Sequence, residues 1–315
     1  MPTVYVSGCL STVGIFTINA LLDRGYTVIG GDNFSINPCI RQDEIKTTRN
    51  FMLHDTNFYT EEKIFRKYDI NAILHLAGRT VASESYKNPE IYCSTNIEYT
   101  ASILQAAITF GIPRFVFASS SAVYGDIYST MVDEVTIPMP NSVYGITKYA
   151  SELLVKNYHN YGNLETISLR YYNIFAPIHY YTLNSIVPLF ANKIWNDEPI
   201  TLYNNGIQRR QLVHIDNIVH ANILALETDK AHCFGESFNV SVDDVPITLE
   251  ELVNILYKGF NKAPNYTLSD EITIGDIETC WGGITKANRL LGYTTQKTIQ
   301  EGLNEYIEWY KNVYS

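Results

Sequence analysis

Short apolar runs recur along the first half of the chain, and amphipathic stretches separate them. The apolar runs without polar alternation are Thr3–Ser7, Tyr26–Gly30, Ala72–Leu76, Arg114–Ser119 and Thr166–Tyr171. Apolar positions at helical spacing occupy Ile15–Arg24, Glu61–Lys67, Ile97–Phe110 and Tyr144–Tyr161. Strands that are apolar on both faces are typical of a parallel sheet covered by helices. The alternation therefore predicts an α/β fold, a doubly wound parallel sheet with right-handed crossovers.

The pattern changes after Asn173. Segments rich in aromatic residues, proline and asparagine are mixed there with predicted helices at Leu249–Tyr257 and Ile299–Trp309. Doubly wound sheets bind ligands beyond the carboxyl ends of their strands. We therefore expect a smaller mixed C-terminal lid over that edge, and predict a sheet domain of residues 1–173 with 213–245 and a substrate-binding lid of residues 174–212 with 246–315.

Composition narrows the class of protein. The 315 residues are 46% hydrophobic and 18% charged, which is typical of a globular chain. A net charge of −10 argues against nucleic acid and anionic membranes as partners. The chain lacks a long apolar run and a basic, apolar leader, and its five cysteines and seven histidines show no metal-ligand spacing. We therefore expect a cytoplasmic protein with no membrane association and no metal.

A candidate phosphate-binding loop follows the first predicted strand. "VSGCLSTVG" has glycine at the first and last positions of a G-x-x-G-x-x-G loop, Gly8 and Gly14, and Ser11 in the middle. The first glycine permits a tight turn, the middle one avoids the pyrophosphate, and the last allows helix and strand to pack closely. Serine is small, and its hydroxyl can donate to a phosphate oxygen. Taken alone, the loop is equally compatible with an ordinary strand–helix turn.

An acidic residue after the second strand sharpens this interpretation. Asp32 follows that strand about 20 residues beyond the loop, where a carboxylate accepts hydrogen bonds from both adenosine ribose hydroxyls and repels a 2′-phosphate. The alternative is a helix cap or turn residue. Loop and aspartate together predict that the sheet domain is a Rossmann domain and that its cofactor is NAD rather than NADP.

Candidate catalytic groups lie farther along. Tyr144 and Lys148 are four residues apart on one helix face, where an ammonium lowers the pKa of a phenol towards the range useful for acid–base catalysis. The spacing by itself is common by chance. Ser119, Ser120 and Ser121 end a buried strand, at the edge where this fold has its active site. A capped turn is the alternative explanation for these serines.

In combination, these residues resemble the extended short-chain dehydrogenase/reductase family, the NAD-dependent nucleotide-sugar epimerases and dehydratases. The resemblance covers nearly the whole chain, through "HLAG" (His75–Gly78), "NPEIYCSTN" (Asn88–Asn96), "SSSAVYG" (Ser119–Gly125), "YGITK" (Tyr144–Lys148), "LRYYNIFAP" (Leu169–Pro177) and "KANRLLG" (Lys286–Gly292). It implies that Tyr144 is the acid–base group, that Lys148 is its partner and a ribose ligand, and that Ser120 hydrogen-bonds the reacting sugar oxygen.

The resemblance also implies two sets of binding residues. The cofactor set is Gly8, Ser11, Thr12, Val13, Gly14, Asp32, Asn33, Asp55, Thr56, Leu76, Ala77, Gly78, Asn96, Tyr144, Lys148 and Tyr171, with Asp55 at the adenine amine. The substrate set is Ser121, Asn173, Arg210, Asp276 and Cys280. Arg210 would bind the diphosphate, as a guanidinium can do in bidentate fashion, unless it is a solvated surface charge.

Departures from the family pattern bear on the reaction. The 4,6-dehydratases carry an Asp-Glu pair where this chain has Ser121 and Ala122, so dehydration is not expected. The stretches "GRTVASES" (Gly78–Ser85) and "SSSAVYG" instead resemble the UDP-galactose 4-epimerase group, which implies inversion at C4. Cys280 occupies the position of a bulky tyrosine in some 4-epimerases and implies that N-acetylhexosamines also fit, UDP-GlcNAc/GalNAc as well as UDP-Glc/Gal. A buried core residue is the alternative for Cys280.

The sequence is also compatible with other functions. The same fold supports an NAD(P)-dependent nucleotide-4-ketosugar reductase or dehydrogenase, or a different ketosugar epimerase. A catalytically silent NAD-binding regulatory protein is favoured by Ser11 and by Thr273, which stands where the family has a second arginine, and is opposed by intact Ser120, Tyr144 and Lys148. Helices Ile91–Phe110 and Tyr144–Tyr161 resemble the pair that forms a four-helix bundle between subunits, which implies a homodimer.

Overall fold

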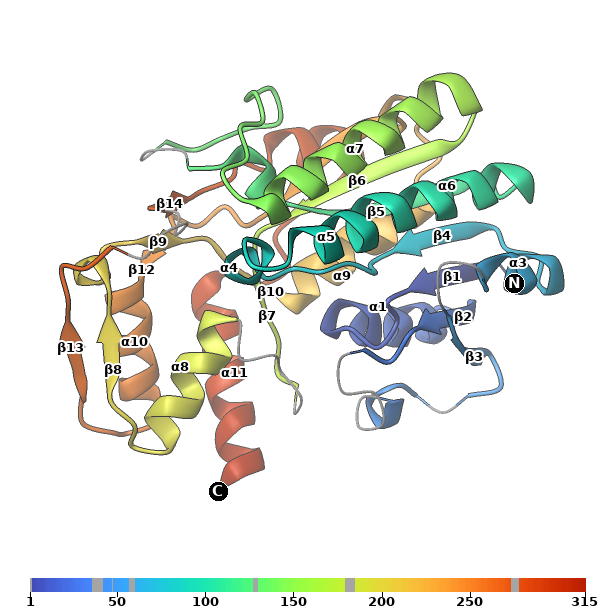
Figure 1. The fold of residues 1–315 in the computed structure, drawn as a ribbon. Helices are drawn as coiled ribbons and strands as arrows, with labels where there is room; N and C mark the ends of the chain where they lie inside the picture. The colour runs from blue at the N-terminus through green and yellow to red at the C-terminus, as the bar shows by residue number, and fades with distance from the viewer. Residues whose placement is uncertain are drawn as a thin grey trace.

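A parallel β-sheet forms the centre of the molecule (Figure 1). The computed structural model describes residues 2–35, 42–46, 48–56, 60–126, 130–178, 185–272 and 278–315. Within these ranges seven strands pair in parallel in the order β11-β6-β5-β4-β1-β2-β3. Their bounds are β1 Thr3–Ser7, β2 Thr27–Asp32, β3 Phe51–Asp55, β4 Ala72–His75, β5 Arg114–Ser120, β6 Glu165–Tyr171 and β11 Glu236–Val240. The predicted doubly wound sheet is confirmed.

The five predicted strands form the interior of this sheet, and the two strands that the apolar pattern missed are its edges. β3 is only half-buried along its length, and β11 begins with the partly exposed Glu236 and Ser237. An edge strand has one neighbour and needs less apolar sequence than an interior strand. Apolar runs therefore identify the interior strands and miss the edges.

Helices cover both faces of the sheet. Helices α3 (Glu61–Lys67), α6 (Tyr99–Thr109) and α7 (Val143–Gly162) lie over one face, and α1 (Thr12–Asp23) and α9 (Ile215–Glu227) over the other (Figure 1). The alternation along β1 shows the division, because Tyr5 packs into the first layer and Val4 and Val6 into the second. Side chains of successive strand residues point to opposite faces, so each face has its own apolar core.

The helical segment before α6 begins earlier than the apolar spacing predicts. Short helices α4 (Ala82–Ser85) and α5 (Pro89–Tyr92) precede it, and a π-helical turn at Cys93–Glu98 joins α5 to α6. Proline is well tolerated in the first turn of a helix, where its missing N–H is not needed. The early start places Asn96 in this turn, where it is buried and hydrogen-bonded to the backbone of Arg79 in the loop after β4.

The second half of the chain packs against the sheet and shares its apolar core, which includes Phe175, Tyr306 and Tyr310. Its helices are α8 (Ile186–Trp195), α10 (Leu249–Gly259) and α11 (Ile299–Tyr314), and its strands are β7 (Asn173–Phe175), β8 (Ile200–Leu202), β9 (Arg209–Arg210), β10 (Leu212–His214), β12 (Ile247–Thr248), β13 (Tyr266–Leu268) and β14 (Thr279–Cys280). Capping boxes at Thr248 and Thr298 begin the two predicted helices. The exact division into two domains stays a prediction.

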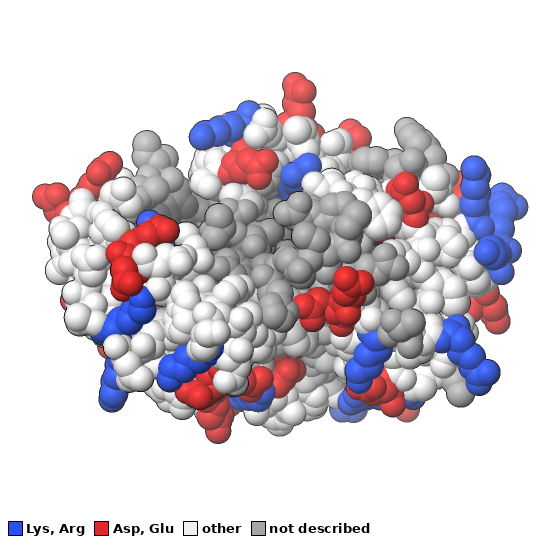
Figure 2. All heavy atoms as spheres, turned by 90° about the horizontal axis from the view of Figure 1, so that it is seen from below, with Lys and Arg blue, Asp and Glu red and all other residues white. Residues whose placement is uncertain are grey.

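Charge is dispersed over one face of the molecule (Figure 2). Lys and Arg side chains are interspersed with Asp and Glu over the described part of the face in Figure 2. Recognition of an anionic ligand therefore depends on individual cations inside a site. In the part of the chain that the structure describes, no helix is both long and apolar enough to cross a bilayer.

Candidate active site

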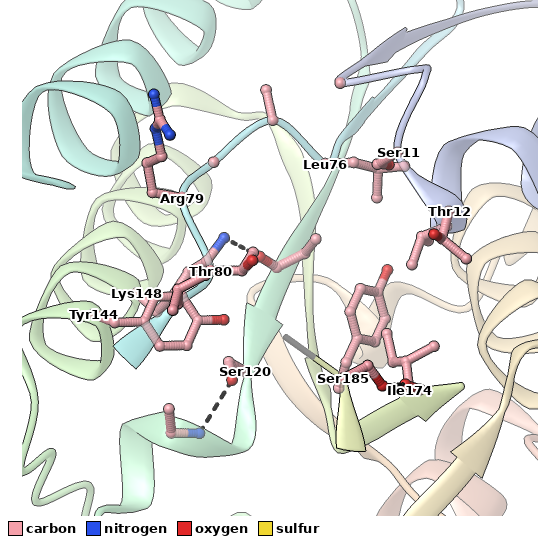
Figure 3. Close-up of a pocket in the computed structure, with 18 of the residues that line it drawn as sticks. Ser11, Thr12, Leu76, Arg79, Thr80, Ser120, Tyr144, Lys148, Ile174 and Ser185 are labelled. Atoms are coloured by element: carbon pink, nitrogen blue, oxygen red, sulfur yellow. Dashed lines mark hydrogen bonds between the residues drawn. The ribbon is translucent and has the colours of Figure 1, made fainter. Parts of the chain in front are cut away.

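A cavity of about 740 Å³ lies at the carboxyl ends of the strands, between the sheet and the second half of the chain. Most of the predicted site residues line it, although they come from segments far apart in the sequence. These are Gly8, Ser11, Thr12, Val13, Asp32, Asn33, Thr56, Leu76, Ala77, Gly78, Ser120, Ser121, Tyr144, Lys148, Tyr171, Asn173, Arg210 and Cys280. Ser11 and Thr12 form one side of the pocket, and Tyr144, Lys148 and Ser120 face them from the other (Figure 3).

The phosphate loop has the conformation that a dinucleotide needs. Gly8 has a φ of 66°, and a Cβ there would lie 2.8 Å from the backbone of Ala77. A Cβ on Gly14 would lie 2.4 Å from the Cys9 carbonyl oxygen. Both glycines are therefore required by close backbone approaches. The amino terminus of α1 opens towards the cavity, where helix N–H groups favour a phosphate.

Ser11 fits this loop without strain. Its φ of −69° lies in the extended region, so the position does not need glycine. Its Oγ accepts a hydrogen bond from the Gly14 N–H at 3.1 Å and thereby caps α1. The hydroxyl hydrogen is not used in that bond. Serine at this position therefore supports the helix that faces the phosphate, and remains compatible with donation to a ligand oxygen.

Asp32 is a turn residue, and its position also leaves its predicted role at the ribose open. Its Oδ2 accepts from the Leu10 N–H and its Oδ1 from the Phe34 N–H, both at 3.0 Å, so it is a turn residue that ties β2 to the phosphate loop. It also lines the cavity. Each carboxylate oxygen has a second lone pair, which leaves room for ribose hydroxyls. Together with the glycine loop, this geometry fits NAD.

Three predicted cofactor residues do not line the cavity. Asp55 is exposed at the end of β3, and Gly14 packs against Cys9 inside the first turn of α1. Asn96 is buried behind the loop after β4: its Nδ2 donates to Thr147 Oγ1 (2.9 Å) and the Arg79 carbonyl (3.1 Å), and its Oδ1 accepts from the Arg79 N–H (2.8 Å). These bonds make Asn96 a support of that loop. Asp276 and Thr273 lie outside the described residues.

The predicted catalytic residues come together at the start of α7 and the end of β5. Ser142 caps α7 by accepting the Gly145 N–H at 3.1 Å, so Tyr144 and Lys148 fall in the first turns and are both buried. Ser120 ends β5 and accepts the Ala122 N–H at 3.2 Å, so the capped turn is present as well. The Tyr144 hydroxyl points into the same space as Ser120 (Figure 3).

The expected lowering of the Tyr144 pKa is wrong for this structure. Burial raises the pKa of Tyr144, and a hydrogen bond with Ser120 only partly opposes that. Burial also lowers the pKa of Lys148, to about 8. The Lys148 Nζ donates to the Ala118 carbonyl at 2.8 Å and lies 5.0 Å from the centre of the Phe117 ring. Desolvation disfavours the charged forms of both groups and is the largest cause of each shift.

The structure separates the two arginines of β9. Arg210 is buried and lines the cavity, so a solvated surface charge is ruled out for it. Arg209 is exposed, and its Nη1 donates to the Pro246 carbonyl at 3.0 Å. β9 pairs in parallel with β14, which brings Cys280 beside Arg210. Cys280 is partly buried, packs against the main apolar core and also lines the cavity, so both interpretations of it stay open.

Several lining residues were not predicted from the sequence. Arg79, Thr80 and Ser83 lie in the segment that follows β4, and the position of that segment after a strand was a usable signal. Ile174, Ser185, Ile186 and Pro188 enter from β7 and the region of α8, and carried no such signal. In the close-up, the Arg79 guanidinium points away from Tyr144 and Ser120 (Figure 3).

Comparisons with known proteins agree with this site. The chain matches the NAD dependent epimerase/dehydratase family over residues 4–241. It is 28% identical to the UDP-glucuronate 4-epimerase of Thermodesulfobacterium geofontis, across 97% of this chain and 95% of that protein. The UDP-glucose 4-epimerase of Thermotoga maritima, solved with UDP-glucose, superposes with a TM-score of 0.91 at 25% identity, covering 99% of this chain and 100% of that one.

The UDP-glucuronic acid 4-epimerase of Bacillus cereus, solved with UDP-glucuronic acid and NAD, has a TM-score of 0.90 at 26% identity and covers 99% of this chain and 100% of that one. The predictions of the family, of an enzyme of the extended short-chain dehydrogenase/reductase type and of NAD as its cofactor are confirmed at the level of the family. The chain belongs to the NAD dependent epimerase/dehydratase family.

Proposed function

We propose that the protein inverts C4 of a UDP-activated hexose through a transient 4-keto sugar. The observation that carries this proposal is the convergence of Ser120, Tyr144 and Lys148 on one wall of a cavity whose opposite wall is the glycine loop. The names of the relatives point to the same reaction, since both UDP-glucuronate and UDP-glucose 4-epimerases are among them.

In this proposal Tyr144, Ser120 and Lys148 have separate roles. Bound NAD supplies a hydride acceptor that also returns the hydride. The phenolate form of Tyr144 would take the proton of the 4-hydroxyl, and the phenol so formed would later give it back, while Ser120 hydrogen-bonds the same sugar oxygen. The Lys148 ammonium has three donors, so it can keep the Ala118 carbonyl while it binds ribose hydroxyls. Burial raises the pKa of Tyr144, and the hydrogen bond with Ser120 opposes that rise.

The small side chain of Cys280 leaves space for a hexose at the proposed sugar end of the cavity. Cys280 is small, and its thiol donates to the Ser121 hydroxyl at 3.5 Å, so this corner offers both space and polar groups. We propose UDP-GlcNAc/GalNAc and UDP-Glc/Gal as substrates, with Arg210 at the diphosphate. UDP-glucuronate joins this set because relatives with that substrate match nearly the full chain.

The decisive experiment is proton NMR of each nucleotide sugar incubated with purified protein in D₂O, with no cofactor added. UDP-GlcNAc, UDP-glucose, UDP-glucuronate and a UDP-4-ketosugar form the panel, and the ketosugar is also tested with added NADH. Appearance of the C4 epimer without deuterium at C4 supports the proposal, because the same hydride must leave and return. Turnover only with stoichiometric added cofactor would identify a ketosugar reductase. Bound NAD with no conversion of any sugar, ketosugars included, would identify a catalytically silent protein.

We also propose a homodimer through α5, α6 and α7. Large apolar side chains are exposed along these helices, at Ile91, Ile108, Ile146, Leu153 and Tyr161. Such a surface is typical of a protein interface. Sedimentation equilibrium should give twice the chain mass, and Leu153→Glu should give a folded monomer. A wild-type monomer at micromolar concentration would contradict this proposal.

A further inference from the structure

A buried ion pair between Glu152 and Arg170 lies next to the elements that carry the three proposed catalytic residues. Glu152 follows Lys148 by one helical turn on the same face of α7, and is 4% exposed. Arg170 of β6 binds it in bidentate fashion: Nε donates to Oε1 at 2.9 Å and Nη2 to Oε2 at 2.7 Å. Neither group is used by the proposed reaction, and burying a charge pair is costly unless every member is satisfied.

The ion pair is hydrogen-bonded to β5, the strand that ends in Ser120. The Ser119 hydroxyl donates to Glu152 Oε1. In the sheet, Ser119 pairs with Arg170, and Ser120 pairs with Tyr171. Glu152 therefore connects α7, the end of β5 and the end of β6 at the residues immediately before Ser120 and Tyr171.

The same network continues towards the sugar end of the cavity. Arg170 Nη1 donates to the Tyr124 hydroxyl, which donates in turn to Asn239 Oδ1, both at 2.8 Å. Asn239 Nδ2 donates to the Gly283 carbonyl at 3.2 Å, three residues beyond Cys280. The pair thus links the catalytic helix to the segment that lines the proposed sugar pocket.

Glu152 is also the charged group that raises the pKa of Lys148. Tyr144 faces Lys148 from α7, His75 from β4, and Arg170 lies beyond Glu152 on β6. Burial holds the pKa of His75 near 3, so it is neutral, and burial keeps Tyr144 protonated. Among the described groups around Lys148, Glu152 is the carboxylate that opposes the lowering of the Lys148 pKa by burial.

We propose that Glu152 is a positioning residue for the reaction: its carboxylate keeps the Lys148 ammonium charged and fixes the end of β5 that carries Ser120. This inference rests on the proposed function of Ser120, Tyr144 and Lys148. Its direct readout is the protonation of Lys148, which requires no turnover.

The test is an NMR titration of protein labelled with [13Cε]lysine, with the Lys148 resonance assigned by its loss in Lys148→Met. Glu152→Gln keeps an oxygen that can accept from Ser119 but removes the charge. The Lys148 midpoint should fall by about one pH unit. Ser119→Ala keeps the charge and removes the hydrogen bond, so the midpoint should stay while kcat falls. In the active enzyme, the alkaline limb of kcat should move with the midpoint in Glu152→Gln.

A second variant covers the risk that Glu152→Gln does not fold, since it leaves the Arg170 cation buried without its partner. Glu152→Gln/Arg170→Met removes both charges and should still lower the Lys148 midpoint. Glu61→Gln is the matched control, because Glu61 is a buried carboxylate on α3 whose partner is Tyr99. An unchanged midpoint in the folded double variant overturns the inference. A wild type that converts no sugar refutes the proposed function, whereas the titration still decides the role of Glu152.

Discussion

The two ends of the cavity are built in different ways. The proposed cofactor end consists mostly of backbone: the glycine loop, the amino terminus of α1 and the turn after β2, all within the first 35 residues. The proposed sugar end consists of side chains from β5, α7, β7, α8, β9 and β14, which span residues 120–280. Where the wall of the site is backbone, an added side-chain atom clashes with it. Where the wall is made of side chains, a substitution keeps the fold but removes one functional group. Substitutions at the proposed cofactor end should therefore lower stability and NAD binding together, whereas those at the proposed sugar end should mainly lower activity.

The largest effect is expected at the sugar end, from Tyr144→Phe. Loss of the phenolic hydroxyl removes the acid–base group, so kcat should fall by roughly 10²–10⁴-fold. NAD should still bind, because the glycine loop is untouched. Single-turnover assays and the NAD content of the purified protein check both statements. Activity within twofold of wild type would refute the assigned role.

At the cofactor end, Gly8→Ala should damage the fold and the cofactor site together. The new Cβ adds left-handed strain of about 1–2 kcal/mol and a clash with the Ala77 backbone. Gly25→Ala is the matched control, since Gly25 also has a positive φ but has open space around its Cβ position. Urea unfolding and NAD titration should show a small stability loss for Gly25→Ala, and a larger loss with failure to bind NAD for Gly8→Ala. Equal effects would contradict the clash.

Lys148 lies where the two ends meet, and its burial has a cost that depends on pH. Its pKa is lowered from the ordinary 10.5 to about 8, so below pH 8 the folded state carries an unfavourable charge worth about 3 kcal/mol. Between pH 8 and 10.5 the folded state releases this proton while the unfolded state keeps it, so stability rises with pH. Lys148→Met should therefore be more stable than wild type at pH 7, and the difference should shrink by pH 9.5. Urea unfolding at both values measures it.

Arg210→Leu tests a side-chain contact of the sugar end. If Arg210 binds the diphosphate, its loss removes a charge-assisted hydrogen bond worth about 1.5–3 kcal/mol, and KM should rise on the order of 10–100-fold. Arg209→Leu is the control, because Arg209 lies on the same strand but is exposed. A similar change of KM in both variants would argue for a general charge effect.

The smallest effect is expected at Ser11. Ser11→Ala removes the cap of α1 and should cost about 1 kcal/mol, whereas Ser11→Gly should cost a few tenths. NAD affinity should stay close to wild type in Ser11→Gly, because the loop already has a suitable conformation. A large gain in affinity with glycine would show that the serine side chain obstructs the pyrophosphate.

Much of the cofactor end could be predicted from the sequence. The loop, Asp32 and the strand that precedes each are local patterns, because turn geometry and burial act between residues that are close in the chain. Side-chain direction is not local in this way: Asn96, which the family pattern assigned to the cofactor, is turned by its helix towards Arg79 and Thr147, and its role at the cofactor stays a prediction. A motif gives the identity of a residue, whereas the direction of its side chain depends on packing.

Sequence by itself determined the interior strands, the helices between them, the glycine loop and the Tyr144–Lys148 spacing, since hydrophobic periodicity and backbone sterics are short-range. Tertiary structure alone decided that Cys280 adjoins Arg210, and that Glu152, Arg170 and Ser119 form one buried cluster. It also decided the direction of the Tyr144 pKa, which burial raises. Desolvation depends on everything that surrounds a group in space, and no spacing along the chain reports it.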